Sequence, residues 1–361
     1  MKTPETRIRK AWMFWPAVLL ILAAAILTNG ISLVPPQHYQ RLAENPFITR
    51  LDISADNYWQ ETVLLPAIAF ILKWNNPISF NLFCFFILAT AYLLFAGLSY
   101  EKFGFIPALI FTAILAFSPL TTILFSWLGT PDGVTFLFTI PMFFTNSWLL
   151  IFLLSILGVT NHAIFLLAAL EILALRWISR NTISLRHMIA ACLGGITGYL
   201  AVWWFLLSHH IQVSSRLEFI FSKNLNEWIR LNALNFPLTV FSLFNVLWLT
   251  LILCTLIFYK KKPCFYSLVW VLLLLNYGIS FLTFDTTRIF SLISWGVLLQ
   301  CIFFSYELSE GGESNSLASR RSFLKILAVT GLLAFLSPRY YSWEGGLHPA
   351  PLLERILRDI Q

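Results

Sequence analysis

The stretch WMFWPAVLLILAAAIL, residues 12–27, decides the fold class of this chain. It begins an apolar run that continues to about Val34, and a run of this length crosses the hydrocarbon core of a bilayer as a helix. Basic residues, among them Arg9 and Lys10, precede it, so the positive-inside rule places the N-terminus in the cytoplasm. Because no small-residue cleavage site follows, we interpret the run as a retained first span instead of a signal peptide.

The whole chain shares this apolar character. Its 361 residues are 58% hydrophobic and 11% charged, against about 25% charged in a typical soluble domain. This composition predicts an all-α, polytopic integral membrane protein with a single membrane domain over residues 1–361. A net charge of +7 would suggest nucleic acid as the partner of a soluble protein. Here the basic residues follow the positive-inside rule, so we expect membrane lipids as partners and no nucleic acid.

Alternating apolar and polar segments predict about eleven transmembrane helices, with the N-terminus inside and the C-terminus outside. Two long outer loops, 35–78 and 209–235, and an outer tail, 338–361, complete this arrangement. In the first loop, the short apolar segment 63–74 predicts an interfacial or re-entrant helix, and in the second loop an amphipathic pattern predicts a helix on the membrane surface. The predicted spans are 12–34, 79–98, 103–119, 134–146, 148–160, 162–177, 188–208, 236–258, 265–283, 289–305 and 323–337.

A polar island, RLDISADNYW at residues 50–59, interrupts the apolar chain in the first outer loop. If this segment is helical, Asp52 and Asp56 lie four residues apart on one face. Two carboxylates that share one space repel each other when both are ionised, which raises the pKa of one and provides a proton acceptor. The alternative is a solvated loop that caps a helix, and the ten residues alone favour neither interpretation.

Further polar residues lie at the outer ends of the predicted spans, at the level of the island. Asp132, Asp285, Arg288 and the pair His209–His210 belong to this set. Ionisable groups near a membrane are costly unless they line a cavity or find partners, so their grouping predicts a single outward-facing site. Each has a structural alternative: the aspartates as helix N-caps, Arg288 as a partner of Asp285 or a snorkelling side chain, and the histidines as an interfacial pair instead of metal ligands.

Three other features fit packing better than chemistry. Asn161–His162 is a weaker case of the same kind as the histidine pair. Glu171 lies inside a predicted span near its inner end, where we expect a structural bond to a neighbouring span. The five cysteines lie within or near apolar spans without metal-ligand spacing, so we interpret them as packing residues.

Two short motifs carry a resemblance to a known family. QETVLLP, residues 60–66, is an amphipathic stretch that follows the island, and GTPD, residues 129–132, opens the fourth predicted span. This layout resembles the multi-span glycosyltransferases of the C type, the GT-C superfamily, over roughly residues 1–180, and GTPD resembles their second acidic position. These enzymes take a sugar from a polyprenyl-phosphate carrier, so the resemblance implies that Asp52 or Asp56 of the first outer loop is the base. The chain departs from better-known members in lacking a large soluble C-terminal domain, which leaves the acceptor open.

We therefore expect a glycosyltransferase that uses a polyprenyl-phosphate sugar at the outer face of a bacterial-type inner membrane. A lipid-linked donor needs a cavity open to lipid and cationic or hydrogen-bonding groups for its phosphate, and the acceptor hydroxyl needs a carboxylate base. We assign the base to Asp52 or Asp56, with Asp52 preferred because it lies close to Arg50. No residue is assigned as a metal ligand, and a divalent cation is left open as a cofactor. The residues assigned to substrate binding are Arg50, Asp132, His209, His210, Asp285 and Arg288.

Two other classes of function stay open. A transporter or flippase for lipid-linked glycans would show internal repeats and broken helices in matching positions, and the sequence reveals neither. A non-catalytic membrane assembly subunit would tolerate replacement of both Asp52 and Asp56.

Overall fold

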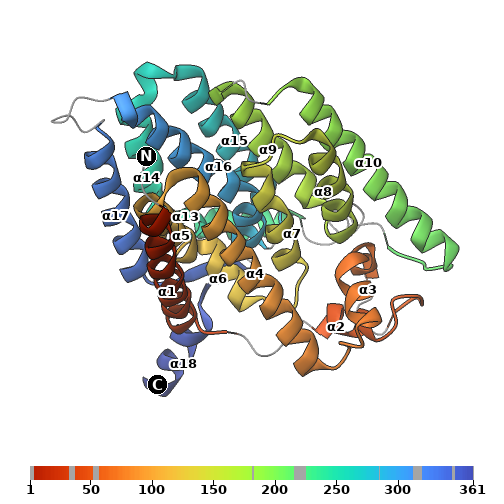
Figure 1. Ribbon diagram of the computed structural model, residues 1–361. Helices are drawn as coiled ribbons and strands as arrows, with labels where there is room; N and C mark the ends of the chain where they lie inside the picture. Colours follow the sequence, from red (N-terminus) through yellow and green to blue (C-terminus); the bar gives the residue numbers. More distant parts are fainter. Residues whose placement is uncertain are drawn as a thin grey trace.

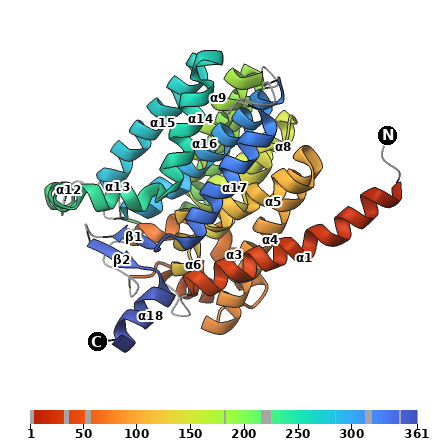
Figure 2. The ribbon, with the colours of Figure 1, turned by 90° about the vertical axis from the view of Figure 1, so that its left-hand side faces the viewer.

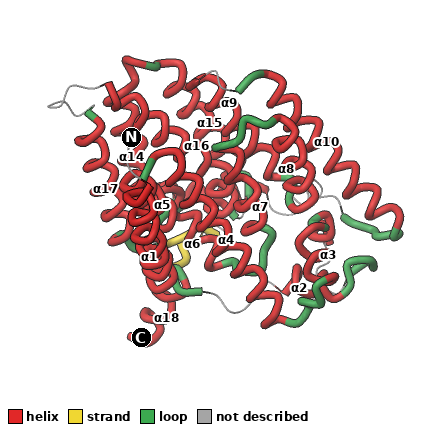
Figure 3. The backbone as a smooth tube through the Cα atoms, in the orientation of Figure 1, coloured by secondary structure: helices red, strands yellow, loops and turns green. Residues whose placement is uncertain are grey.

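The computed structural model describes residues 4–31, 37–51, 57–180, 183–214, 225–283, 285–311, 319–343 and 346–360. Most of these residues are helical, so the predicted all-α class is confirmed (Figures 1 and 3). Two antiparallel strands, β1 (Tyr340–Trp343) and β2 (Gly346–Pro349), form a hairpin near the C-terminus. The described helices are α1 (Pro4–Asn29), α2 (Gln37–Glu44), η1 (Asn57–Glu61), α3 (Leu64–Ile71), α4 (Pro77–Phe103), α5 (Phe105–Ala116), α6 (Pro119–Ser126), α7 (Asp132–Thr139), η2 (Ile140–Phe143), α8 (Trp148–Asn161), α9 (Ile164–Arg180), α10 (Leu185–Ser208), α12 (Leu225–Leu234), α13 (Phe236–Phe244), α14 (Leu247–Phe258), η3 (Tyr259–Lys261), α15 (Pro263–Phe281), α16 (Thr286–Leu308), η4 (Ser309–Gly311), α17 (Arg320–Leu336) and α18 (Pro351–Ile360).

Five of the described helices are long and apolar enough to cross a membrane: α1 from Trp12 to Asn29, α4, α10, α15 and α16. Two pairs of consecutive helices, α5–α6 and α13–α14, are also long and apolar enough when each pair is taken together. If each pair is one span, the number of candidate spans is seven. These seven coincide with seven of the eleven predicted spans. The other four fall on shorter helical segments, namely Asp132–Phe143, α8, α9 and α17.

The two helix pairs are bent, α5–α6 by 54° and α13–α14 by 76°. They are broken helices that the sequence interpretation missed. In the first, Pro119 opens α6, and Ser118 before it adopts an extended conformation, because proline disfavours the helical region for the preceding residue. In the second, Asn245 has a φ of 44°, a left-handed conformation that ends α13.

Helix α16 forms the centre of the bundle, and 94% of its most apolar 18-residue stretch is buried. It contacts α6, α9, α13, α14 and α15. Trp295 packs between Phe136 and Phe143, with ring centroids 4.9 and 5.0 Å away. Helices α1 and α10 lie at the periphery instead, and α1 projects from the bundle toward its N-terminus (Figures 1 and 2).

Helices α8 and α10 approach each other closely because α10 carries two glycines, Gly194 and Gly198, four residues apart on its contact face. A Cβ added at Gly194 would lie 2.4 Å from the carbonyl oxygen of Phe152, and one added at Gly198 would lie 2.7 Å from that of Ile156. This is the small-residue packing by which membrane helices bring their backbones together.

The segments predicted as outer loops and tail contain short ordered elements. The first loop holds α2, η1 and α3, of which the eight-residue α3 is too short to span. The second holds α12. The C-terminal tail is a hairpin that packs on α6, α13 and α16, followed by α18. Figure 2 shows the hairpin, α18, α12 and α13 gathered toward one end of the bundle.

Candidate functional site

The turn between α6 and α7 delivers one aspartate into the protein interior. Gly129 has a φ of 102°, which lets the chain reverse after Trp127, and Asp132 then begins α7 with no exposed surface. Pro131 holds the N-cap position without a side-chain bond, so Asp132 is not the cap of this helix. Asp285 does occupy the N-cap position of α16, but its side chain makes no capping bond there. The capping alternative is therefore wrong for Asp132, whereas Asp285 lies at the predicted N-cap position and accepts a hydrogen bond from Arg288.

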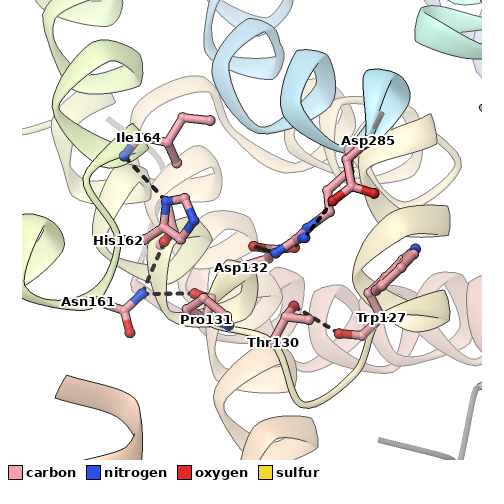
Figure 4. A network of polar contacts seen from close by, with 10 residues as sticks. Trp127, Thr130, Pro131, Asp132, Asn161, His162, Ile164 and Asp285 are labelled. Atoms are coloured by element: carbon pink, nitrogen blue, oxygen red, sulfur yellow. Dashed lines mark hydrogen bonds and ion pairs between the residues drawn. The ribbon is translucent and has the colours of Figure 1, made fainter. Parts of the chain in front are cut away.

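Arg288 lies in the first turn of α16, and both aspartates bind it. Its Nε and Nη2 donate to the two carboxylate oxygens of Asp132 at 2.6 and 3.1 Å, and its Nη1 donates to Asp285 at 3.0 Å. All three side chains are buried. Figure 4 shows Asp132 and Asp285 on opposite sides of these ion pairs. We call these residues the buried triad, and it contains two negative charges against one positive charge.

The C-terminal hairpin and an aromatic pair cover the triad. The guanidinium of Arg288 lies 5.5 Å from the centre of the Trp127 ring, and Trp127 meets Trp343 of β1 edge to face at 5.7 Å. The backbone N–H of Ser342 donates to the Thr287 hydroxyl at 2.8 Å, next to Arg288 in α16. The hairpin thus holds the start of α16 and closes the triad on one side, a role that the sequence did not indicate.

The polar island is tied down at its base by Gln60. The backbone N–H of Arg50 donates to the side-chain oxygen of Gln60 at 2.8 Å, and the amide nitrogen of Gln60 donates to the Ile48 carbonyl at 2.8 Å. Arg50 itself donates to the Arg41 carbonyl of α2 at 2.9 Å, so this side chain anchors the loop to α2. The predicted bases, Asp52 and Asp56, lie outside the described residues.

The two histidines assigned to substrate binding do not contact the triad. His209 and His210 are exposed at the end of α10. The His209 ring contacts Phe47 of the first loop at 5.0 Å and hydrogen-bonds the Phe205 carbonyl at 2.9 Å. In the described part of the chain, no group of three or more His, Cys, Asp or Glu side chains is arranged to hold a metal ion.

A cavity of about 130 Å³ lies between the first loop, the α8–α9 turn and α10. Glu61 and His162 supply polar groups on its wall, and Tyr199 and Trp203 of α10 supply aromatic ones. On this wall the first loop is bound to the end of α8, because the backbone N–H of Val63 donates to the Thr160 carbonyl at 3.1 Å. Glu61 and His162 were not among the predicted site residues, although both had been noted in the sequence, in the QETVLLP motif and beside Asn161.

The cavity and the triad share one connection. Asn161, next to His162, donates to the carbonyl of Pro131 at 2.8 Å and to the Thr135 hydroxyl at 3.1 Å. Pro131 directly precedes Asp132 (Figure 4). The hydrogen bond from Asn161 to Pro131 connects the residue before Asp132 with the residue before His162.

Glu171 has the structural role that its depth suggested. Its carboxylate accepts a hydrogen bond from Asn276 of α15 at 2.9 Å, and Asn276 also donates to Ser294 of α16 at 3.1 Å. These bonds connect α9, α15 and α16, so the predicted bond to a neighbouring span is confirmed.

The described site therefore has two parts, the buried triad and a separate cavity whose wall holds an acid, a histidine and aromatic side chains. Comparisons of the chain with protein-family models, with curated proteins and with solved structures find no match.

Proposed function

We propose that this protein is a GT-C-type glycosyltransferase that moves a sugar from a polyprenyl-phosphate carrier to an acceptor at the outer face of a bacterial-type inner membrane. The cavity beside α10 carries the proposal. It combines Glu61 and His162 with the face of α10 on which Tyr199 and Trp203 are 62% and 56% exposed. A donor with a polar head and a long apolar chain needs this combination, because its head requires hydrogen-bonding groups while its chain stays in lipid.

The roles that we propose follow the loop into this cavity. Asp52 or Asp56 is the base. Both belong to the loop whose two ends are held together by the hydrogen bonds of Gln60, and Glu61 follows directly after Gln60. Glu61 and His162 orient the sugar or the acceptor hydroxyl. Arg288 is a positioning residue, since its donors already bind two carboxylates.

The finer topology belongs to the same proposal: eleven spans, with the N-terminus inside and the C-terminus outside. The four shorter helical segments then cross as partial or locally thinned spans. In a variant without its native cysteines, we expect Gln212→Cys to react with an impermeant thiol reagent added outside intact cells, and Lys262→Cys to stay unlabelled. Both side chains are exposed. The reverse labelling pattern would invert the topology and put the cavity on the inner face.

The broken helices favour a second candidate, a transporter or flippase for lipid-linked glycans. Transporters bind their substrates at interrupted helices, and α5–α6 and α13–α14 are both interrupted. A transporter would move the lipid-linked glycan without changing its covalent structure, whereas a transferase releases the polyprenyl phosphate. A non-catalytic assembly subunit would do neither.

The test of the proposed function is sugar transfer by membranes that hold equal amounts of wild type, Asp52→Asn, Asp56→Asn and a control, Glu101→Gln. Asparagine keeps the shape of the base but cannot accept the proton. General-base catalysis contributes about 10²–10⁴-fold, or roughly 3–5 kcal/mol of barrier, so the variant at the base should lose activity by that factor. Glu101 is exposed at the far end of α4, and its variant should be unchanged. If both aspartate variants keep more than about a tenth of the wild-type rate, the first loop does not supply the base.

A further inference from the structure

An open apolar groove runs along the bundle between α1, α5 and α17. Its volume is about 490 Å³, and apolar side chains and one glycine line it. The hollow exists because small residues face it from all three helices, Ala24 of α1, Ala113 of α5, and Ala328 and Gly331 of α17. A cavity of about 150 Å³ is enough to bind benzene, so this groove has room for a lipid chain.

A buried cation, Arg339, lies against two phenylalanines that line one end of the groove. Phe117 and Phe335 close that end, and Arg339, three residues beyond α17, contacts both. Its guanidinium lies 5.3 Å from the centre of the Phe117 ring, and its Nη2 donates to the Phe335 carbonyl at 3.2 Å. Arg339 is only 5% exposed. The cation therefore lies where a head group would lie if its chain filled the groove.

Arg339 lacks the partners that a buried charge normally has. Its Nη1 is buried without a hydrogen-bond partner, and no acidic side chain in the described part of the chain forms an ion pair with it. Burial lowers the pKa of Arg339 to about 10, which still leaves it charged at neutral pH. Keeping a buried charge uncompensated is costly, so this position requires an anion that the described chain does not provide.

The geometry points to an anionic glycerophospholipid, bound with an acyl chain in the α1–α5–α17 groove and its phosphate on Arg339. Guanidinium is suited to phosphate because its planar N–H groups match two phosphate oxygens. A second protein copy or a soluble anion would satisfy only one half of the site, the groove or the cation. This site is separate from the cavity beside α10, so it does not depend on the proposed transferase activity.

The test is native mass spectrometry of the delipidated full-length protein, titrated with phosphatidylglycerol or phosphatidylcholine of equal chain length. Wild type should bind the anionic lipid in preference. Arg339→Gln should weaken phosphatidylglycerol binding about tenfold and remove the preference, while Arg339→Lys should keep part of it. Gly331→Leu should weaken both lipids by filling the groove. Arg321→Gln, an exposed arginine at the other end of α17, is the matched control and should behave like wild type.

Three outcomes would overturn the inference. Unchanged lipid preference in Arg339→Gln would show that the arginine does not bind the head group. Equally strong competition by inorganic phosphate would indicate a site for a soluble anion. A change of oligomeric state in Gly331→Leu, with lipid binding intact, would make the groove a subunit interface. Circular dichroism of each variant in lipid-free detergent verifies that it is folded.

Discussion

Two arginines at helix ends, Arg288 and Arg339, are equally hidden from solvent but differ in what surrounds them. Their exposed fractions are 6% and 5%. Arg288 directs three N–H groups at two carboxylates. Arg339 has a ring, one carbonyl and an Nη1 without a partner. Burial alone therefore does not reveal the role of a charged residue, because the first charge is compensated within the chain and the second is not.

A third buried arginine, Arg176, makes three short hydrogen bonds to neutral acceptors. Arg176 of α9 donates at 2.6 to 2.7 Å to the carbonyls of Met142 and Thr145 and to the side chain of Asn146. These three short bonds stabilise the connection between η2 and α8. Arg339, with a single carbonyl at 3.2 Å, falls well short of this arrangement.

The largest effect that we expect comes from Arg288→Met. Removing the cation leaves Asp132 and Asp285 buried together without their shared partner, and breaking a buried pair typically costs about 3–5 kcal/mol. Thermal unfolding in detergent should show a strongly lowered midpoint, accompanied by low abundance in membranes. An unchanged midpoint would mean that the triad does not stabilise the fold.

The control for this variant removes the acids as well. Arg288→Met combined with Asp132→Asn and Asp285→Asn takes away all three charges, so it should regain about 1–3 kcal/mol over the single variant. If the triple variant is the less stable protein, shape and packing at the triad matter more than charge compensation. The exposed pair Glu227–Arg230 provides a reference, because Arg230→Gln should leave the midpoint unchanged.

The features that the sequence predicted correctly depend on residues close together in the chain. Apolar runs are local features, and each predicted span therefore falls on a helix or a bent pair. Asp285 and Arg288 are three residues apart, and their pairing was one of the alternatives from the sequence. The bond to Asp132 joins positions 156 residues apart in the chain, so only their common position at outer helix ends hinted at it.

The features that the sequence missed all depend on packing between distant segments. Nothing in YYSWEGGLHP, residues 340–349, indicates that this hairpin covers the start of α16. The sequence grouped His209 and His210 with the aspartates, yet the ring of His209 contacts Phe47 of the first loop. Nothing in the sequence distinguishes Arg339 as a buried residue, because its burial depends on contacts with Phe117 and Phe335.

The smallest effect on stability, and the one that separates the two arginines most clearly, is expected for Arg339→Gln. In lipid-free detergent this variant loses a buried cation that no described acid balances. Its free energy of unfolding should therefore stay within about 0.5 kcal/mol of wild type or rise, since removing an uncompensated charge relieves its desolvation cost. Added phosphatidylglycerol should stabilise the wild type more than the variant, because a ligand that binds only the folded state raises its stability by mass action. A large loss of stability already in the absence of lipid would show that the neutral groups around Arg339 are enough to stabilise it, and the contrast with Arg288 would then be one of partner type instead of charge balance.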